Sequence, residues 1–144
     1  MNAQQRPTPL ALVTGASSGI GYQYARLLAE KGYDLLLVSN EELRIAEVAR
    51  ELRRQFGVRA DGLCRDLSLA DAADSLFEYT RQQGFEVEVL VNNAGVVDDA
   101  FLLMINEDSL TRSLDINIKG YFHCAQQAAL KMMSKKQGVI INVS

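Results

Sequence analysis

Short apolar runs alternate along the chain with longer segments in which apolar residues recur every three or four positions. The runs are typical of strands buried on both faces, and the longer segments are typical of amphipathic helices. The pattern predicts five strands, at residues 10–14, 34–38, 58–64, 87–91 and 139–143. It predicts four helices between them, near residues 19–31, 41–56, 66–83 and 106–135.

Local signals set the expected faces and ends of these helices. The second helix is expected to bury four apolar residues, namely Leu43, Val48, Leu52 and Phe56. The third helix is expected to begin at a cap formed by residues 66–68. The fourth is expected to begin at Asn106, because an asparagine followed by two acidic residues is typical of a helix N-terminus.

The regular alternation of strand and helix predicts a parallel sheet that is covered by helices on both faces. Right-handed crossovers between parallel strands favour the spatial order 3-2-1-4-5. We therefore expect an α/β fold of three layers, with a Rossmann-like doubly wound sheet. No linker, repeat or low-complexity segment interrupts residues 1–144, so one domain is expected to account for the chain.

Polar residues and glycines follow each predicted strand at its carboxyl end. These features are residues 14–21, Ser39–Asn40, Asp66, residues 92–95 and residues 142–144. In a doubly wound sheet these ends share one edge, and ligands bind there between strands 1 and 4. The spacing of Gly15, Gly19 and Gly21 allows a sharp turn, a close approach to a pyrophosphate and tight packing of the next helix. The sequence therefore predicts a nucleotide site.

Composition excludes several other classes of function. Fifteen Lys and Arg against eighteen Asp and Glu give a net charge of −3, and the basic residues are scattered, so a nucleic-acid partner is not expected. Cys64 and Cys124 form no C-x-x-C pair, and His123 is the single histidine, so no metal site is expected. His123 and Cys124 are expected to be packing residues. The first residues are polar, so neither a signal peptide nor a membrane partner is expected. The expected location is therefore the cytoplasm.

The ordered motifs resemble those of the short-chain dehydrogenase/reductase family. They comprise Thr14-Gly15-x-x-x-Gly19-x-Gly21, Asp66, Asn92-Asn93-Ala94-Gly95, Asn117 and Ile141-Asn-Val-Ser144. Residues 91–144 also look like 3-oxoacyl-thioester reductases of this family, although sugar, steroid and xenobiotic reductases share most of that stretch. The resemblance implies hydride transfer between a nicotinamide cofactor and a carbonyl or secondary alcohol.

The resemblance also implies roles for individual residues. The pyrophosphate and adenosine ribose would lie against Gly15, Ser17, Ser18, Gly19 and Ile20, with Gly21 serving helix packing. The adenine would lie against Asp66 and Leu67, and the nicotinamide-side ribose against Asn93, Ala94 and Gly95. The plainer alternatives are that Asp66 only caps a helix and that Asn92 and Asn93 only form a turn.

The family's catalytic set is incomplete within these 144 residues. Asn117, which in the family interrupts the long helix and holds a water in a proton relay, is present. The catalytic serine is expected one residue beyond Ser144, and no tyrosine of the chain has a lysine four residues downstream. General acid catalysis needs a titratable group at the carbonyl oxygen. The chain is therefore expected to be a truncated cofactor-binding part that is inactive alone.

The identity of the cofactor depends on the residues after the second strand. An acidic residue there favours NAD, whereas an arginine pairs with the 2′-phosphate of NADP. Ser39 and Asn40 fit neither pattern and can bond to either ribose, and Glu41 lies beyond the usual acidic position. The absence of an acid at residue 39, with Arg44 nearby, favours NADP, and NAD stays open.

Two alternatives to a functioning oxidoreductase remain. One is a nucleotide-binding module without turnover, and the other is an inactive fragment. A fragment would leave the last strand as an open edge and one apolar face of the long helix uncovered, at Leu110, Leu114, Ile118 and Phe122. In the family the long helix pairs across a dimer face, so a homo-oligomer is expected by analogy.

Overall fold

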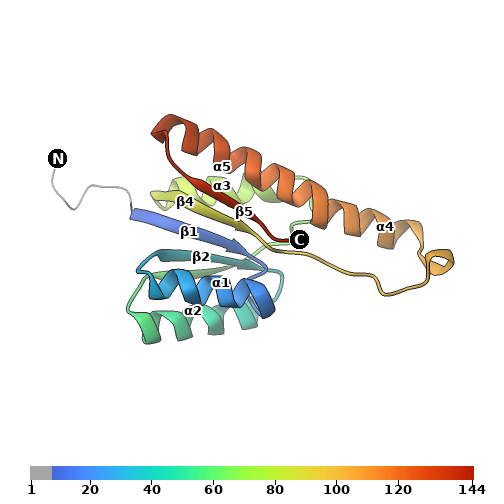
Figure 1. Cartoon of the computed structure of the whole chain (residues 1–144), viewed down its shortest axis with the longest axis horizontal. Helices are drawn as coiled ribbons and strands as arrows, with labels where there is room; N and C mark the ends of the chain where they lie inside the picture. Colours follow the sequence, from blue (N-terminus) through green and yellow to red (C-terminus); the bar gives the residue numbers. More distant parts are fainter. Residues whose placement is uncertain (1–7) are drawn as a thin grey trace.

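The computed structural model describes residues 8–144, which are built around a five-stranded parallel sheet (Figure 1). The strands are β1 (Thr8–Thr14), β2 (Asp34–Ser39), β3 (Ala60–Cys64), β4 (Phe85–Asn92) and β5 (Val139–Asn142). They lie in the order β3-β2-β1-β4-β5, and each neighbouring pair is parallel. The predicted fold class and strand order are therefore confirmed.

Helices cover both faces of the sheet and give the fold three layers (Figure 1). One face packs against α1 (Gly19–Glu30) and α2 (Glu42–Phe56). The other packs against α3 (Ala72–Gln82) and α5 (Tyr121–Lys135). The central strands are apolar on both sides because each has a helical layer above and below it, so Leu35 and Leu36 of β2 both have no exposed surface.

The buried face of α2 differs from the predicted one. The buried residues of α2 are Ile45, Val48, Ala49 and Leu52, and half-buried Phe56 packs against the same core as predicted. The prediction for Leu43 was wrong, since its side chain is 82% exposed. Leu43 lies nine positions before Leu52, which is two and a half helical turns and places it on the opposite side of the helix.

The predicted cap of the third helix was also wrong. The carboxylate of Asp66 accepts hydrogen bonds from the backbone N–H of Ser68, at 3.0 Å, and from its hydroxyl, at 2.6 Å. These bonds form a local turn at residues 66–68, in which the aspartate side chain replaces helical backbone hydrogen bonds. The helix α3 therefore begins only at Ala72. Asp66 is thereby placed in the loop after β3 and not at a helix start.

The long helix after β4 contains an irregular segment. It begins with α4 (Glu107–Leu114), and Asn106 caps it as predicted by accepting a hydrogen bond from the N–H of Ser109 at 2.9 Å. A π-helical segment, η3 (Asp115–Gly120), then leads into α5. A π turn places an extra residue in the helix and is frequent at functional sites. Asn117 lies within this segment.

One apolar face of this helical rod is uncovered, as predicted. Leu110, Leu114, Ile118 and Phe122 are each between 42% and 60% exposed. The loop before the rod contains a short helical turn, η2 (Leu102–Met104), whose three side chains are also exposed. This apolar surface therefore has no covering partner among the described residues.

The buried hydroxyl of Thr14 connects the ends of the two central strands. Its oxygen accepts hydrogen bonds from the backbone N–H groups of Asn93 and Ala94, each at 3.0 Å. The hydroxyl donates to the carbonyl of Val91 at 3.4 Å. Thr14 has no exposed surface, so water cannot replace these bonds. The loop after β4 is thereby fixed against the glycine turn after β1.

The corrected face of α2 leads to a stability prediction with an internal control. We expect Leu52→Ala to lower the free energy of unfolding by about 2–5 kcal/mol, because it leaves a cavity under a fully buried side chain. The same substitution at exposed Leu43 should change it by no more than about 0.5 kcal/mol. Urea unfolding followed by circular dichroism measures both, and equal losses would contradict the assigned face.

A second prediction concerns Thr14. Thr14→Val keeps the side-chain volume but leaves the N–H groups of Asn93 and Ala94 without an acceptor, which should cost about 1–3 kcal/mol of stability. Hydrogen exchange at these two amides should accelerate in this variant. Thr14→Ser retains the hydroxyl and should keep both amides protected. Unchanged exchange in Thr14→Val would show that the hydroxyl does not hold the loop.

Candidate functional site

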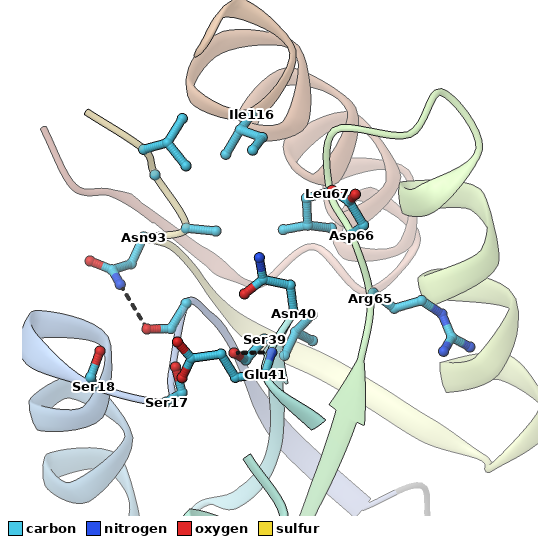
Figure 2. Close-up of a pocket in the computed structure, with 15 residues that line it drawn as sticks. Ser17, Ser18, Ser39, Asn40, Glu41, Arg65, Asp66, Leu67, Asn93 and Ile116 are labelled. Atoms are coloured by element: carbon cyan, nitrogen blue, oxygen red, sulfur yellow. Dashed lines mark hydrogen bonds between the residues drawn. The ribbon is translucent and has the colours of Figure 1, made fainter. Parts of the chain in front are cut away.

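A cavity of about 280 Å³ opens at the edge of the sheet where β1, β2, β3 and β4 end (Figure 2). It is bordered by the loops that follow these strands and by the π segment η3. Its lining residues are Gly15, Ser17, Ser18, Val38, Ser39, Asn40, Glu41, Arg65, Asp66, Leu67, Asn93, Ala94, Gly95, Val96 and Ile116. We call it the sheet-edge cavity.

The structure brings most of the predicted cofactor residues to this cavity. All of them line it except Gly19 and Ile20, which lie in an adjoining groove along α1 with Gln23, Tyr24 and Leu27. The residues that the sequence did not indicate are Val38, Glu41, Arg65, Val96 and Ile116. Four of these directly adjoin predicted residues in sequence, and Ile116 adjoins Asn117.

The glycine turn has the backbone that its spacing predicts. Gly15 has φ +64° and Gly19 has φ +58°, both in the left-handed region that favours glycine. A Cβ on Gly15 would lie 2.9 Å from the Cα of Ala94, and a Cβ on Gly21 would collide with the carbonyl oxygen of Gly15. Gly21 therefore permits close packing of α1, and Gly15 permits the close approach of the loop after β4.

The amino end of α1 has backbone donors without a side-chain cap. Ser18 stands at the N-cap position with φ −161°, but its side chain makes no capping bond. The first intrahelical bond runs from the N–H of Tyr22 to the carbonyl of Ser18. The preceding N–H groups of the helix have no intrahelical acceptor, as in every α-helix, and together with the helix dipole they suit an anion.

Asn92 and Asn93 form more than a turn. The side-chain amide of Asn93 donates to the carbonyl of Gly15 at 3.2 Å (Figure 2). It also donates to the carbonyl of Thr14 at 3.3 Å. The amide of Asn92, which is 1% exposed, donates to the carbonyl of Tyr121 and to the side-chain oxygen of Asn142. The pair therefore ties β4 to the glycine turn on one side and to β5 and α5 on the other.

Asp66 presents a charged acceptor at the cavity. The hydroxyl and backbone N–H of Ser68 hold the pKa of its carboxyl below the usual range, because both donate to the ionised form. Asp66 is therefore ionised at neutral pH, with Leu67 as its apolar neighbour on the same wall. This combination suits a flat heteroaromatic ring that carries an amino group.

The loop after β2 carries charges of both signs. The hydroxyl of Ser39 accepts a hydrogen bond from the N–H of Glu41 at 3.0 Å, which fixes the loop where Glu41 lines the cavity. Arg44, in the first turn of α2, donates from Nε to the carbonyl of Ser17 at 3.2 Å. Its guanidinium therefore lies beside the glycine turn, next to a residue that lines the cavity.

A second cavity of about 670 Å³ adjoins the first and shares Asn93, Gly95 and Val96 with it. Asn117 lies on its wall, where its side chain accepts from the N–H of Val96, at 2.9 Å, and donates to the carbonyl of Val96, at 2.8 Å. Asn117 thus holds the loop after β4 against the π segment. On the same wall, the Tyr121 hydroxyl donates to the carbonyl of Val143, and burial raises the pKa of this phenol.

Two further predictions concern residues outside the cavities. Cys124 is buried as expected, and burial raises the pKa of its thiol to about 11. The prediction that His123 is a packing residue was wrong, since its side chain is exposed and stacks edge to face with Phe122. Residues 8–144 contain no group of three or more potential metal ligands. None of the helices described for this chain is both long and apolar enough to cross a bilayer.

Several curated proteins with similar sequences are named as reductases. The sequence is 36% identical over 137 residues to a 3-oxoacyl-[acyl-carrier-protein] reductase of Staphylococcus aureus, which covers 95% of this chain and 56% of that relative. A reductase of the same name from Aquifex aeolicus is 30% identical over 135 residues. The chain thus spans about half the length of the curated relatives it matches.

Solved structures support the same relationship. A short-chain dehydrogenase from Sphingobium yanoikuyae in complex with NADPH matches 93% of this chain and 52% of its own, at a TM-score of 0.86 and 30% identity. L-sorbose reductase from Gluconobacter frateurii, complexed with NADPH and L-sorbose, matches 94% of this chain and 51% of its own, at a TM-score of 0.88 and 27% identity. The short chain dehydrogenase family matches residues 9–144, and this chain belongs to that family.

Proposed function

We propose that this chain is the dinucleotide-binding part of an oxidoreductase that transfers a hydride between NADP(H) and a carbonyl or secondary alcohol. The observation that carries the proposal is the convergence of the loops after four strands on one cavity, where the missing Cβ of Gly15 lets the loop after β4 approach the glycine turn closely. The nicotinamide, when bound, supplies or accepts the hydride. The protein residues bind and orient it.

Different parts of the cavity suit different parts of a dinucleotide. The glycine turn and the amino end of α1 suit the pyrophosphate, because they combine N–H donors with close backbone access. Gly19 and Ile20 do not line the cavity, but they lie in the first turn of α1, and the contribution that we propose for them is made by the backbone. The ionised Asp66 can accept a hydrogen bond from the adenine amino group beside Leu67. Asn93, Ala94 and Gly95 lie where the cavity meets its larger neighbour, which suits the nicotinamide-side ribose.

The cofactor that we favour is NADP. Ser39 is not acidic, and its hydroxyl and the side chain of Asn40 can donate to a phosphate or a ribose. Arg44 supplies a guanidinium beside Ser17, within the same part of the site. Glu41 opposes this preference by like charge. The two matched structures are complexes with NADPH, and this supports the preference for NADP.

The substrate that we favour within the carbonyl class is a 3-oxoacyl thioester, because the curated relatives carry that activity in their names. The larger cavity beside Asn117 suits the substrate end of the site, since it adjoins the nicotinamide end of the smaller one. Asn117 is proposed as the catalytic member that the chain contains, holding a water of a proton relay from the π segment.

A second candidate is a nucleotide-binding module without turnover. The observation that favours it is that no tyrosine within residues 1–144 has a lysine four positions later. Both candidates require the dinucleotide to bind, and they differ only in turnover. We expect the 144-residue chain to bind the cofactor and to show no nicotinamide oxidation by itself.

Fluorescence titration with NADPH and NADH tests the proposal. We expect saturable binding, which Gly15→Ala weakens at least tenfold because the added Cβ meets the backbone of Ala94. Gly57→Ala is the matched control, since Gly57 has a similar φ of +68° but open space around it. That control should cost about 1 kcal/mol of stability and leave affinity unchanged. Failure to bind either cofactor at millimolar concentration would remove both candidates.

The role of Arg44 in choosing the cofactor has its own test. Arg44→Ala should weaken NADPH binding about tenfold, which is the loss of one charge-assisted bond to the 2′-phosphate, and should leave NADH binding unchanged. Arg50→Ala removes the same side chain from the exposed side of the same helix and should affect neither cofactor. Equal losses for both cofactors in Arg44→Ala would instead assign Arg44 to holding the glycine turn.

A further inference from the structure

A third cavity lies at the opposite end of the sheet, where β4 begins, and we call it the basal cavity. It has a volume of about 250 Å³. Its walls come from the last turns of α3 and α5, the first half of β4 and the turn after α5. None of its residues lines the sheet-edge cavity or the larger cavity beside it. It therefore requires a separate explanation.

The pairing of β4 explains why this space is open. The first residue of β4 that pairs with β5 is Val89, so the preceding residues of β4 have no strand on that side. β4 also contains a bulge, because Leu10 pairs with Val87 whereas Ala11 pairs with Val89. Glu88 is the extra residue, and a bulge redirects the side chains around it. The sheet thus has a notch at its edge, which the end of α5 borders.

The floor of the basal cavity is apolar. Phe85, Val87 and Met132 line it, and each is at most 9% exposed. The hydroxyl of Thr80, which also lines it, already donates to the carbonyl of Phe77 at 2.7 Å. The floor therefore has no unpaired side-chain donor, and it favours an apolar group over a polar one.

The rim of the basal cavity carries charged side chains, of which only some have an ion-pair partner. Lys135 lies 3.7 Å from Glu86, and Glu88 accepts a hydrogen bond from Gln137 at 3.2 Å. Arg81 is paired with Glu78. Among the ion pairs of the described residues, none includes Lys131, whose ammonium is therefore available. Glu88 keeps its negative charge, because Gln137 is neutral. The cavity lining nevertheless carries three basic residues, at positions 81, 131 and 135, against two acidic ones, which favours an anion over a cation.

We propose that the basal cavity binds an amphipathic monocarboxylate, with its apolar body on Phe85, Val87 and Met132 and its carboxylate at Lys131. The volume is slightly below the range of about 300–1,000 Å³ that is usual for drug-sized ligands, so a short alkyl or aryl chain fits. The proposed site is separate from the cavity assigned to the dinucleotide, because the two cavities share no residue.

Octanoate is the probe, titrated into the ¹⁵N-labelled 144-residue chain and followed by amide chemical shifts. We expect saturable shifts confined to residues 84–88 and 131–137. Octanol has the same chain without the charge and should bind at least fivefold more weakly. Octylammonium should bind more weakly still. Octanoate shifts concentrated at the sheet-edge cavity or at the exposed apolar residues 101–104 would overturn the proposal, as would the absence of shifts.

Two variants separate the charge from the shape of the basal cavity. Lys131→Gln should weaken octanoate binding at least fivefold and make octanoate and octanol equal. Lys31→Gln is the control, since Lys31 is an exposed lysine at the end of α1 in the other layer. Ser134→Trp places a large ring at the mouth and should abolish binding of both probes. Equal octanoate binding in Lys131→Gln and Lys31→Gln would refute the role of Lys131, whether or not the nicotinamide cofactor binds.

Discussion

The edge of the sheet that carries the proposed cofactor site depends on one buried hydroxyl. Thr14 ends β1, and its oxygen accepts from two consecutive N–H groups of the loop after β4. Strands 1 and 4 are neighbours in the sheet but lie far apart in the sequence, so their end loops have no covalent reason to keep a fixed spacing. The hydroxyl provides that spacing, and Asn93 reinforces it from the other side through the carbonyls of Thr14 and Gly15. The lining of the sheet-edge cavity follows from this junction.

The parts of the structure that the sequence predicted are those set by local and periodic constraints. Apolar runs with helical segments between them require a covered parallel sheet, and the handedness of crossovers then leaves few strand orders. The glycine turn was predictable because Gly15 and Gly19 adopt a backbone that other residues rarely reach. The polar residues after each strand were predictable for the same topological reason. Their contacts with a dinucleotide stay a prediction.

The parts that the sequence did not predict depend on tertiary contacts or on competition between local structures. Asp66 reads equally as a helix cap and as the start of a turn, and its bonds to Ser68 decide in favour of the turn. Leu43 carries an apolar side chain without facing the core, because the helical phase of α2 is set by Ile45 and Leu52. Ile116 reaches the cavity from a π segment, and the notch beside β4 arises because β5 begins only opposite Val89, neither of which a periodic pattern signals.

The helical rod from α4 through α5 borders all three cavities. Ile116 lines the wall of the sheet-edge cavity, and Met132 lines the floor of the basal cavity. Sixteen residues separate them, which corresponds to about 24 Å along a helix. The rod therefore acts as a strut between the two ends of the sheet. A translation along its axis would therefore change the shapes of both cavities together.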